Sequence, residues 1–267
     1  ALFVSYQAPH YPVQPAEAYA AMYKDAMIHH RPNCDEIDPY TRTWSPPSPW
    51  PPAECQDYQR YGEDLDTYLR LYYAMVTQID ANVGRLLDRL DDLGLTDETV
   101  VIFTADHGDM QGSHGLKNKR LPFEESAGIP LIVRAPGGAK GLVTEALVSG
   151  IDFYPTCLHY AGVEPVEGLP GTDFAPLTLG DAQILNGPVF SEMDEWKMVR
   201  QSSWKLVVEG EAYEPTHLYD LARDPYELEN RVDDPDQTWR VAALRREIVE
   251  WQAMTAEAAM AAEDAGG

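Results

Sequence analysis

The sequence has 267 residues, a formal net charge of −24 and 44% hydrophobic residues. This composition is that of a folded protein, and the length allows one large domain or a large domain with a small one. The acidity argues against nucleic acid or an anionic membrane surface as a partner, and no apolar run reaches the roughly 18 residues of a membrane span. Three cysteines are too few for a disulfide scaffold or a four-thiolate zinc site, although a Cys34–Cys55 bridge stays open.

The first third of the chain contains one clear helix. Residues 1–6 are apolar enough to predict a buried strand. Residues 8–62 predict a long irregular excursion, because their dense prolines oppose helix and central strand. A one-sided apolar stripe then predicts a helix over 64–93, which Gly94 ends.

The middle of the chain alternates strands with helices. Strands are predicted at 99–104, 129–134 and 145–149, and a helix at 152–160. This alternation indicates an α/β fold with a mostly parallel sheet flanked by helices, in which 99–104 is a buried parallel strand.

From residue 187 the pattern changes to short strands separated by turns. The predicted strands are 189–191, 197–200, 204–208 and 217–220, and a closing helix is predicted at 236–262. We therefore divide the chain into an α/β core over residues 1–186 and a small subdomain over 187–267, made of an antiparallel sheet and a helix.

The strongest local signal for chemistry follows the 99–104 strand. Asp106 and His107 come directly after it, where α/β sheets place their ligands. A carboxylate oxygen and an imidazole nitrogen both bind divalent cations, and Gly108 allows a tight turn beside them. The structural alternative is an Asx-type turn with a solvated histidine.

The loop that follows carries positive charge. It contains His114, Lys117, Lys119 and Arg120, in a chain with few cations. Such a cluster beside a metal-type carboxylate is a candidate oxyanion site, because an ammonium group can hold a sulfate or phosphate oxygen. A solvated loop with incidental lysines is the structural alternative.

In order and spacing these motifs resemble the sulfatases, a branch of the alkaline phosphatase superfamily. Asp106-His107-Gly108 is similar to the family's metal motif. The family's sulfate-contacting lysine lies 13 residues beyond the metal aspartate, and this position is Lys119. Other segments resemble successive parts of the family fold: 79–87, 112–119, 123–133, 149–162, 204–205, 218–221 and 224–230.

The resemblance implies roles for individual residues. Pro9-His10-Tyr11-Pro12 is similar to the family's Pro-His-x-Pro element, which makes His10 the group that contacts sulfate and protonates the leaving oxygen. Without the resemblance, His10 would be a loop histidine between prolines. Lys119 would contact the sulfate, and His114 is a further candidate for that contact. Asp106 and His107 would supply half of the shell of a divalent metal, Ca²⁺ by resemblance, with Mg²⁺ and Mn²⁺ as alternatives.

One departure from the family concerns the nucleophile. Sulfatases oxidise a cysteine or serine to formylglycine within a Cys/Ser-x-Pro/Ala-x-Arg motif, and neither this motif nor the family's paired metal aspartates occur in the sequence. We therefore expect the C-terminal portion of an alkaline-phosphatase-like fold whose N-terminal part is missing. Its expected partner is that missing part or a second copy of the chain.

Three functions follow. The first is metal-dependent hydrolysis of sulfate esters, with this chain inactive alone. The second is a phosphodiesterase or phosphonate monoester hydrolase of the same superfamily. The third is a catalytically inactive binding module. A signal peptide would precede residue 1, so the sequence predicts no compartment.

Overall fold

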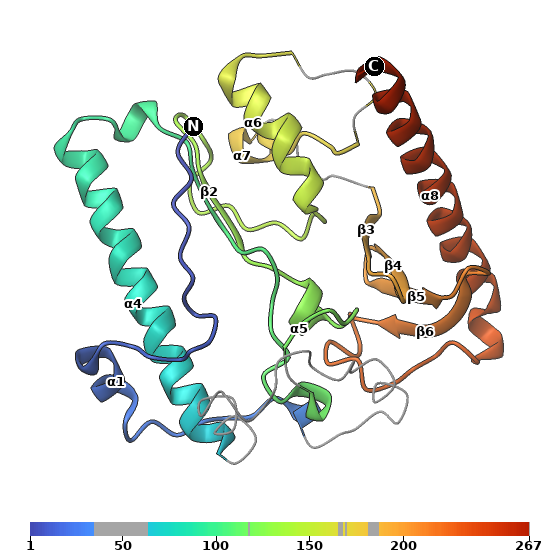
Figure 1. Ribbon diagram of the computed structural model, residues 1–267, viewed down its shortest axis with the longest axis horizontal. Coiled ribbons are helices and arrows are strands. Elements are labelled where there is room, and N and C mark those ends of the chain that lie inside the picture. Colours follow the sequence, from blue (N-terminus) through green and yellow to red (C-terminus); the bar gives the residue numbers. More distant parts are fainter. Residues whose placement is uncertain (35–63, 117, 165–167, 169, 181–186, 267) are drawn as a thin grey trace. The chain divides into compact units, whose positions relative to one another are not determined.

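A computed structural model describes residues 1–34, 64–116, 118–164, 168, 170–180 and 187–266. The chain forms two compact units (Figure 1), one of Ala1–Glu98 with Met110–Lys117 and the other of Thr99–Asp109 with Asn118–Gly267. The predicted boundary at residue 187 stays a prediction.

The first unit is built around α4 (Leu65–Asp92), which confirms the helix predicted over 64–93. The Asp64 carboxylate caps it by accepting a hydrogen bond from the Thr67 amide, 3.0 Å away. Helix α1 (Glu17–Tyr23) packs against α4, where the hydroxyls of Tyr23 and Thr77 lie 2.6 Å apart. The short 3₁₀ turns of this unit are η1 (Pro32–Cys34), η3 (Thr96–Glu98) and η4 (Ser113–Gly115).

Two predictions for the first unit were wrong. The excursion over 8–62 is not irregular throughout, because α1 forms in a proline-free stretch. Residues 35–63, which include Cys55 of the suggested bridge, lie outside the described residues. Residues 1–6 form no strand, and Leu2 and Phe3 are 87% and 94% exposed. A strand needs a hydrogen-bonded neighbour, and none pairs with 1–6 in the described part of the chain.

In the second unit, β1 (Val101–Thr104) pairs with β2 (Leu131–Arg134) in antiparallel register, with Val101 opposite Arg134. The expected parallel arrangement is absent from the described residues. The chain starts β2 next to the end of β1 that it had just left, so the two strands run in opposite directions. The strand predicted at 145–149 does not form either, because no described strand offers it a ladder. The helix predicted at 152–160 is confirmed by η5 (Gly150–Asp152) and α6 (Phe153–Ala161), and α7 (Ala175–Leu179) follows.

The C-terminal antiparallel sheet and helix are confirmed. The strands β3 (Val189–Glu192), β4 (Trp196–Gln201), β5 (Trp204–Glu209) and β6 (Glu214–Asp220) lie in that order, and all pairs are antiparallel. After η6 (Pro235–Gln237), α8 (Thr238–Gly266) covers one sheet face. The core between them is fully buried and consists of Val199, Leu206, Val208, Leu218, Leu244 and Ile248.

The opposite face of this sheet is also covered. Strand alternation turns Lys205 away from α8, together with its cross-strand neighbours Arg200 and Tyr219. Against this face lies the short helix α5 (Glu124–Ala127) with the residues before it, and the rings of Phe123 and Tyr219 are 6.3 Å apart. The sheet therefore supports a segment that follows Lys119 directly in the chain.

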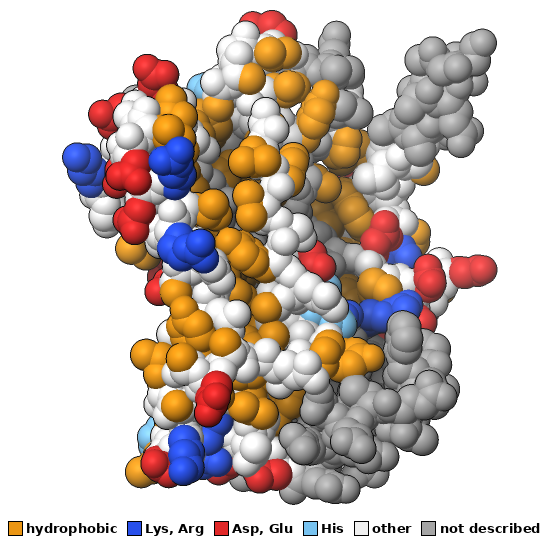
Figure 2. Space-filling model, turned by 60° about the vertical axis from the view of Figure 1, so that its left-hand side comes forward, with side chains coloured by type: hydrophobic (Ala, Val, Ile, Leu, Met, Phe, Trp, Pro, Cys, Tyr) orange, Lys and Arg blue, Asp and Glu red, His pale blue; other side chains and the backbone are white. Residues whose placement is uncertain are grey.

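Many hydrophobic side chains reach the surface on the face shown in Figure 2. In the second unit, Ile132 is 65% exposed and Val143 is 90% exposed. Among the described residues, no helix has the length and apolar character needed to cross a membrane.

These exposed side chains predict self-association, because large apolar surfaces favour contact with other molecules. The isolated chain should show a mass that rises with concentration in light scattering after size exclusion, and F3S/I132S should reduce this rise. M254S, which changes a 54% exposed methionine on α8, is the matched control and should have a smaller effect. A monodisperse monomer at every concentration would contradict this prediction.

Candidate active site

Asp106 and His107 lie just beyond the end of β1, as the sequence predicts. The Nε2 atom of His107 is 3.5 Å from Oδ2 of Asp106, and the other carboxylate oxygen, Oδ1, accepts a hydrogen bond from the His107 amide at 3.0 Å. The Asp106 side chain is 87% exposed, whereas that of His107 is 35% exposed. One carboxylate oxygen and one imidazole nitrogen are therefore presented side by side.

The orientation of His107 suits a metal ligand. Its Nδ1 lies 2.7 Å from the carbonyl oxygen of Gly108, which can only accept, so Nδ1 carries the proton and donates it. This leaves the Nε2 lone pair available beside Asp106, the arrangement typical of metal-binding histidines. The described residues contain no group of three or more His, Cys, Asp or Glu side chains suited to a metal. The pair offers two donors for a metal shell, and its role as a metal site stays a prediction.

Gly108 connects this pair to α5. Its amide donates to the Ser126 carbonyl oxygen at 2.8 Å. A Cβ at position 108 would lie 2.0 Å from the Glu125 carbonyl oxygen, far inside van der Waals contact. The sequence suggested glycine here for a tight turn, but the structure requires it for close approach of the α5 backbone.

The loop after the pair has a strained backbone. Four of its non-glycine residues have positive φ: Gln111 at 46°, His114 at 54°, Asn118 at 66° and Arg120 at 76°. Each such residue is costly, and strain of this kind concentrates at functional sites. This strain agrees with a functional role for the loop. The sequence suggested the same role through the loop's charged residues alone.

The remaining predicted residues divide between the two units. Lys119 is half-buried and belongs to the same unit as Asp106 and His107. In the first unit, His114 is 1% exposed within η4, while His10 is exposed with its Nδ1 2.7 Å from the Tyr11 carbonyl oxygen. Lys117 lies outside the described residues. The structure brings together Asp106 and His107, and the roles of His10, Lys119 and His114 stay predictions.

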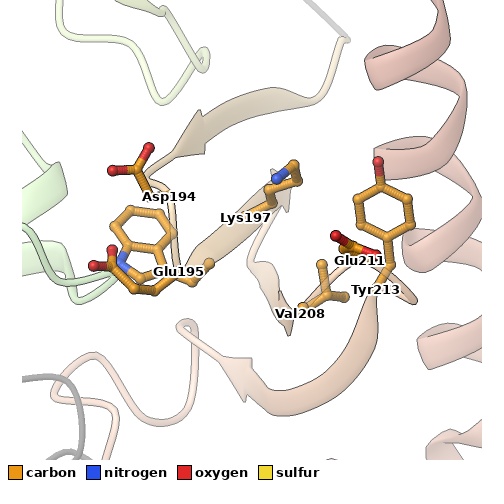
Figure 3. A pocket seen from close by; sticks show the side chains of 8 residues that line it. Asp194, Glu195, Lys197, Val208, Glu211 and Tyr213 are labelled. Atoms are coloured by element: carbon orange, nitrogen blue, oxygen red, sulfur yellow. The ribbon is translucent and has the colours of Figure 1, made fainter.

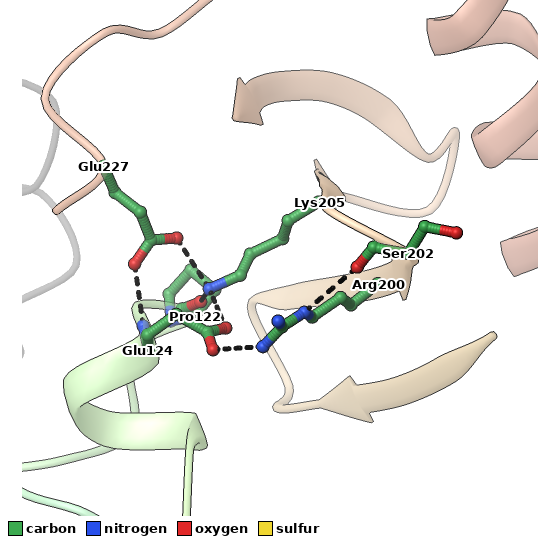
Figure 4. A network of polar contacts seen from close by, with 6 residues as sticks. All are labelled: Pro122, Glu124, Arg200, Ser202, Lys205 and Glu227. Carbon is green, nitrogen blue, oxygen red and sulfur yellow. Dashed lines mark hydrogen bonds and ion pairs between the residues drawn. The ribbon is translucent and has the colours of Figure 1, made fainter. Parts of the chain in front are cut away.

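A buried ion cluster next to this site was missed by the sequence analysis (Figure 4). Lys205 on β5 is fully buried, and its ammonium group contacts three acceptors. They are the Pro122 carbonyl oxygen at 2.6 Å, Glu124 Oε1 at 2.9 Å and Glu227 Oε1 at 2.6 Å. The only sequence signal was a lysine within the apolar run of residues 204–208, a position that a charge occupies only when it is paired.

The two carboxylates of the cluster are shifted in opposite directions. Burial raises the pKa of Glu227 to about 7, against the attraction of Lys205. Burial also raises the pKa of Glu124, but the opposing attraction of Lys205 and Arg200 is stronger and brings that pKa below its usual value. Glu124 is therefore the firmly ionised partner, and Glu227 titrates near neutral pH.

A separate hollow of about 300 Å³ lies on the C-terminal sheet (Figure 3). Its lining combines three carboxylates and two aromatic rings with one lysine, one valine and one glycine: Asp194, Glu195, Glu211, Trp196, Tyr213, Lys197, Val208 and Gly210. None of the predicted site residues reaches it, so it is distinct from the candidate active site.

Comparison with known families identifies the family to which the chain belongs. The family described as Sulfatase matches residues 1–163, and the family described as N-sulphoglucosamine sulphohydrolase, C-terminal, matches residues 112–254. The first match covers more than half of the chain, so the chain belongs to the sulfatase family.

Among curated relatives, the chain is 31% identical to a choline-sulfatase of Rhizobium meliloti strain 1021 over 97% of its own length and 52% of the relative's. It is 32% identical to an arylsulfatase K of Danio rerio, over 72% of this chain and 39% of the relative. The chain thus spans about half or less of the length of these relatives.

Among solved structures, one of a protein bound to its substrate D-glucosamine-2-N,6-O-disulfate matches with a TM-score of 0.77 at 20% identity, over 94% of this chain and 64% of the other. This likeness shows the sulfatase fold. A phosphonate monoester hydrolase of Agrobacterium radiobacter matches with a TM-score of 0.64 at 29% identity, over 73% of this chain and 42% of the other.

The raised pKa of Glu227 predicts a pH-dependent stability. Since the unfolded carboxyl titrates near 4.5 and the folded one near 7, the folded protein binds the extra proton between these values. The resulting stability is fully present below 4.5 and is lost as pH rises through 7. The unfolding free energy of the wild type minus that of E227Q should therefore fall by about 2–3 kcal/mol between pH 5 and 8 in urea titrations.

E229Q is the control, because Glu229 is exposed and lies two residues away. Its difference from the wild type should stay nearly constant over the same range. A constant difference for E227Q as well would show that Glu227 is ionised throughout, held by Lys205.

Proposed function

We propose that the whole protein to which this chain corresponds hydrolyses sulfate esters with the help of a divalent cation, Ca²⁺ by family resemblance. The observation that carries this proposal is the Asp106–His107 pair, whose Oδ2 and Nε2 atoms are 3.5 Å apart beyond β1. Membership of the sulfatase family supports the same reaction. Calorimetric titration of the full-length protein with Ca²⁺, Mg²⁺ and Mn²⁺ tests the metal. Saturable binding that D106N/H107A abolishes supports the proposal, and absence of binding to the wild type refutes it.

In this proposal the cation, when bound, supplies positive charge for a sulfuryl oxygen and for the nucleophile. Asp106 and His107 hold it through one oxygen and one nitrogen. Lys119 stabilises the charge that develops on the sulfuryl oxygens. His10 donates a proton to the departing alcohol oxygen, as a general acid positioned at the leaving group.

The substrate class follows the names of the relatives. They include a choline-sulfatase, arylsulfatases and an N-acetylglucosamine-6-O-sulfatase, so they share the sulfate ester and differ in the alcohol. We assign sulfate-ester hydrolysis without a specific alcohol. The likeness to phosphonate monoester hydrolases keeps that reaction as a second candidate. Paired kcat/KM values on an aryl sulfate and an aryl phosphonate monoester distinguish the two.

The 267-residue chain alone should show no sulfatase turnover. Covalent catalysis needs an activated nucleophile, and the sequence contains no formylglycine motif. The measurement is release of the phenol from an aryl sulfate by the purified chain with each divalent cation. Metal-dependent turnover that D106N abolishes would contradict this expectation and would require a different nucleophile.

In the full-length protein, K119A should lower kcat/KM by about 10²–10³ because it removes a donor to a developing oxyanion. K117A is the matched control, since it removes the same charge from the same loop, and screening by salt should keep its effect below about tenfold. Both variants are measured on one sulfate ester at one ionic strength. Equal losses, or a larger loss at Lys117, would refute the assignment of Lys119.

A further inference from the structure

The buried cluster around Lys205 joins residues that are far apart in the chain. Lys205 lies 83 positions after Pro122, and Glu227 lies 103 positions after Glu124. Three acceptors lie within 2.9 Å of the ammonium group, one by a hydrogen bond and two as ion-pair partners. The cluster therefore concentrates three close contacts on one buried charge, and a displacement of its parts would lengthen at least one of them.

The contacts fix the backbone before and at the start of α5. Lys205 holds the Pro122 carbonyl, and Glu227 Oε2 accepts a hydrogen bond from the Glu124 amide at 2.7 Å. The indole of Trp196 donates to the Arg120 carbonyl oxygen at 3.0 Å. Arg200 pairs with the Glu124 side chain as well. The C-terminal sheet thus holds residues 120, 122 and 124 by directional contacts, which apolar packing alone would not provide.

From α5 the constraint continues to the metal motif. The Ser126 carbonyl accepts from the Gly108 amide at 2.8 Å, and the Gly108 carbonyl accepts from His107 Nδ1 at 2.7 Å. No side chain fits between Gly108 and the Glu125 carbonyl, so α5 and Gly108 can hardly shift independently. Lys119 immediately precedes the held segment.

We propose that Lys205 is a positioning residue: through Pro122, Glu124 and Glu227 it locks α5, and α5 in turn sets the orientation of Gly108 and His107. The C-terminal sheet thereby becomes part of the site's support, although it contributes no residue to the metal pair. This inference rests on the proposed function for its consequence in catalysis, but its structural content is independent of that function.

The test uses the chain itself. K205M alone would leave two carboxylates buried around an apolar side chain, so the main variant is K205M/E227Q, which also neutralises Glu227. W196F is a milder variant that removes a single hydrogen bond to the Arg120 carbonyl and keeps an aromatic ring. K197M is the matched control, because Lys197 lies on the same strand as Trp196, and its ion-pair partner is Glu192.

The first measurement is amide hydrogen exchange. K205M/E227Q should speed exchange at Gly108 and at residues 126–128 by about tenfold or more, with strands β4–β6 still protected. W196F should give a smaller change in the same residues, and K197M none. Unchanged exchange at Gly108 in K205M/E227Q would overturn the proposal. If that variant loses protection in the whole sheet, E124Q decides, because it weakens the ion pair between Lys205 and α5 itself. Faster exchange at Gly108 in E124Q supports the proposal, and no change overturns it.

The second measurement is Ca²⁺ affinity by calorimetry on the same variants of the full-length protein, because the described part of this chain offers only part of a metal shell. Residues that orient a metal ligand typically change affinity by about 10–100-fold, and we expect about tenfold weakening in K205M/E227Q and none in K197M. If the wild type binds no divalent cation, the proposed metal function fails, while the exchange data still judge the positioning role. Equal Ca²⁺ affinity in the wild type and in K205M/E227Q would limit Lys205 to folding and refute positioning.

Discussion

The second unit depends on one buried ammonium group. Lys205 is fully buried, and leaving such a charge without partners is strongly unfavourable, so its three acceptors must be present together. One acceptor is a backbone carbonyl before α5, one is the first residue of α5, and one is Glu227 from the segment after β6. The requirement to pair one charge thus decides how α5 lies against the sheet.

This constraint connects the small antiparallel sheet with the Asp106–His107 pair. One face of the sheet forms an ordinary apolar core with α8, from Leu206 to Ile248. The other face carries Trp196, Arg200 and Lys205, which hold the segment after Lys119 by directional contacts. Strand alternation separates these two tasks, so the same strand β5 contributes to the core and to the support of the site.

The candidate site itself is simple in its described part. Asp106 and His107 offer two donors, and Gly108 links them to α5 by its amide and its missing side chain. Membership of the sulfatase family supplies the chemical context for this pair. The chain spans about half of its choline-sulfatase relative, so the proposed reaction is a proposal about the whole protein rather than about these residues alone.

The sequence by itself determined the local features: α4 and α8 from their apolar faces, the four C-terminal strands from short runs between turns, and the place of the Asp106–His107 pair just after β1 from a short motif. These features depend on neighbouring residues, so spacing reveals them. The tertiary structure alone decided the antiparallel pairing of β1 with β2, the exposure of residues 1–6 and the formation of the Lys205 cluster. It also showed that position 108 must be glycine because the α5 backbone lies against it. Each of these depends on which distant segment lies alongside, and a single sequence carries no direct signal for contacts between residues 83 or 103 positions apart.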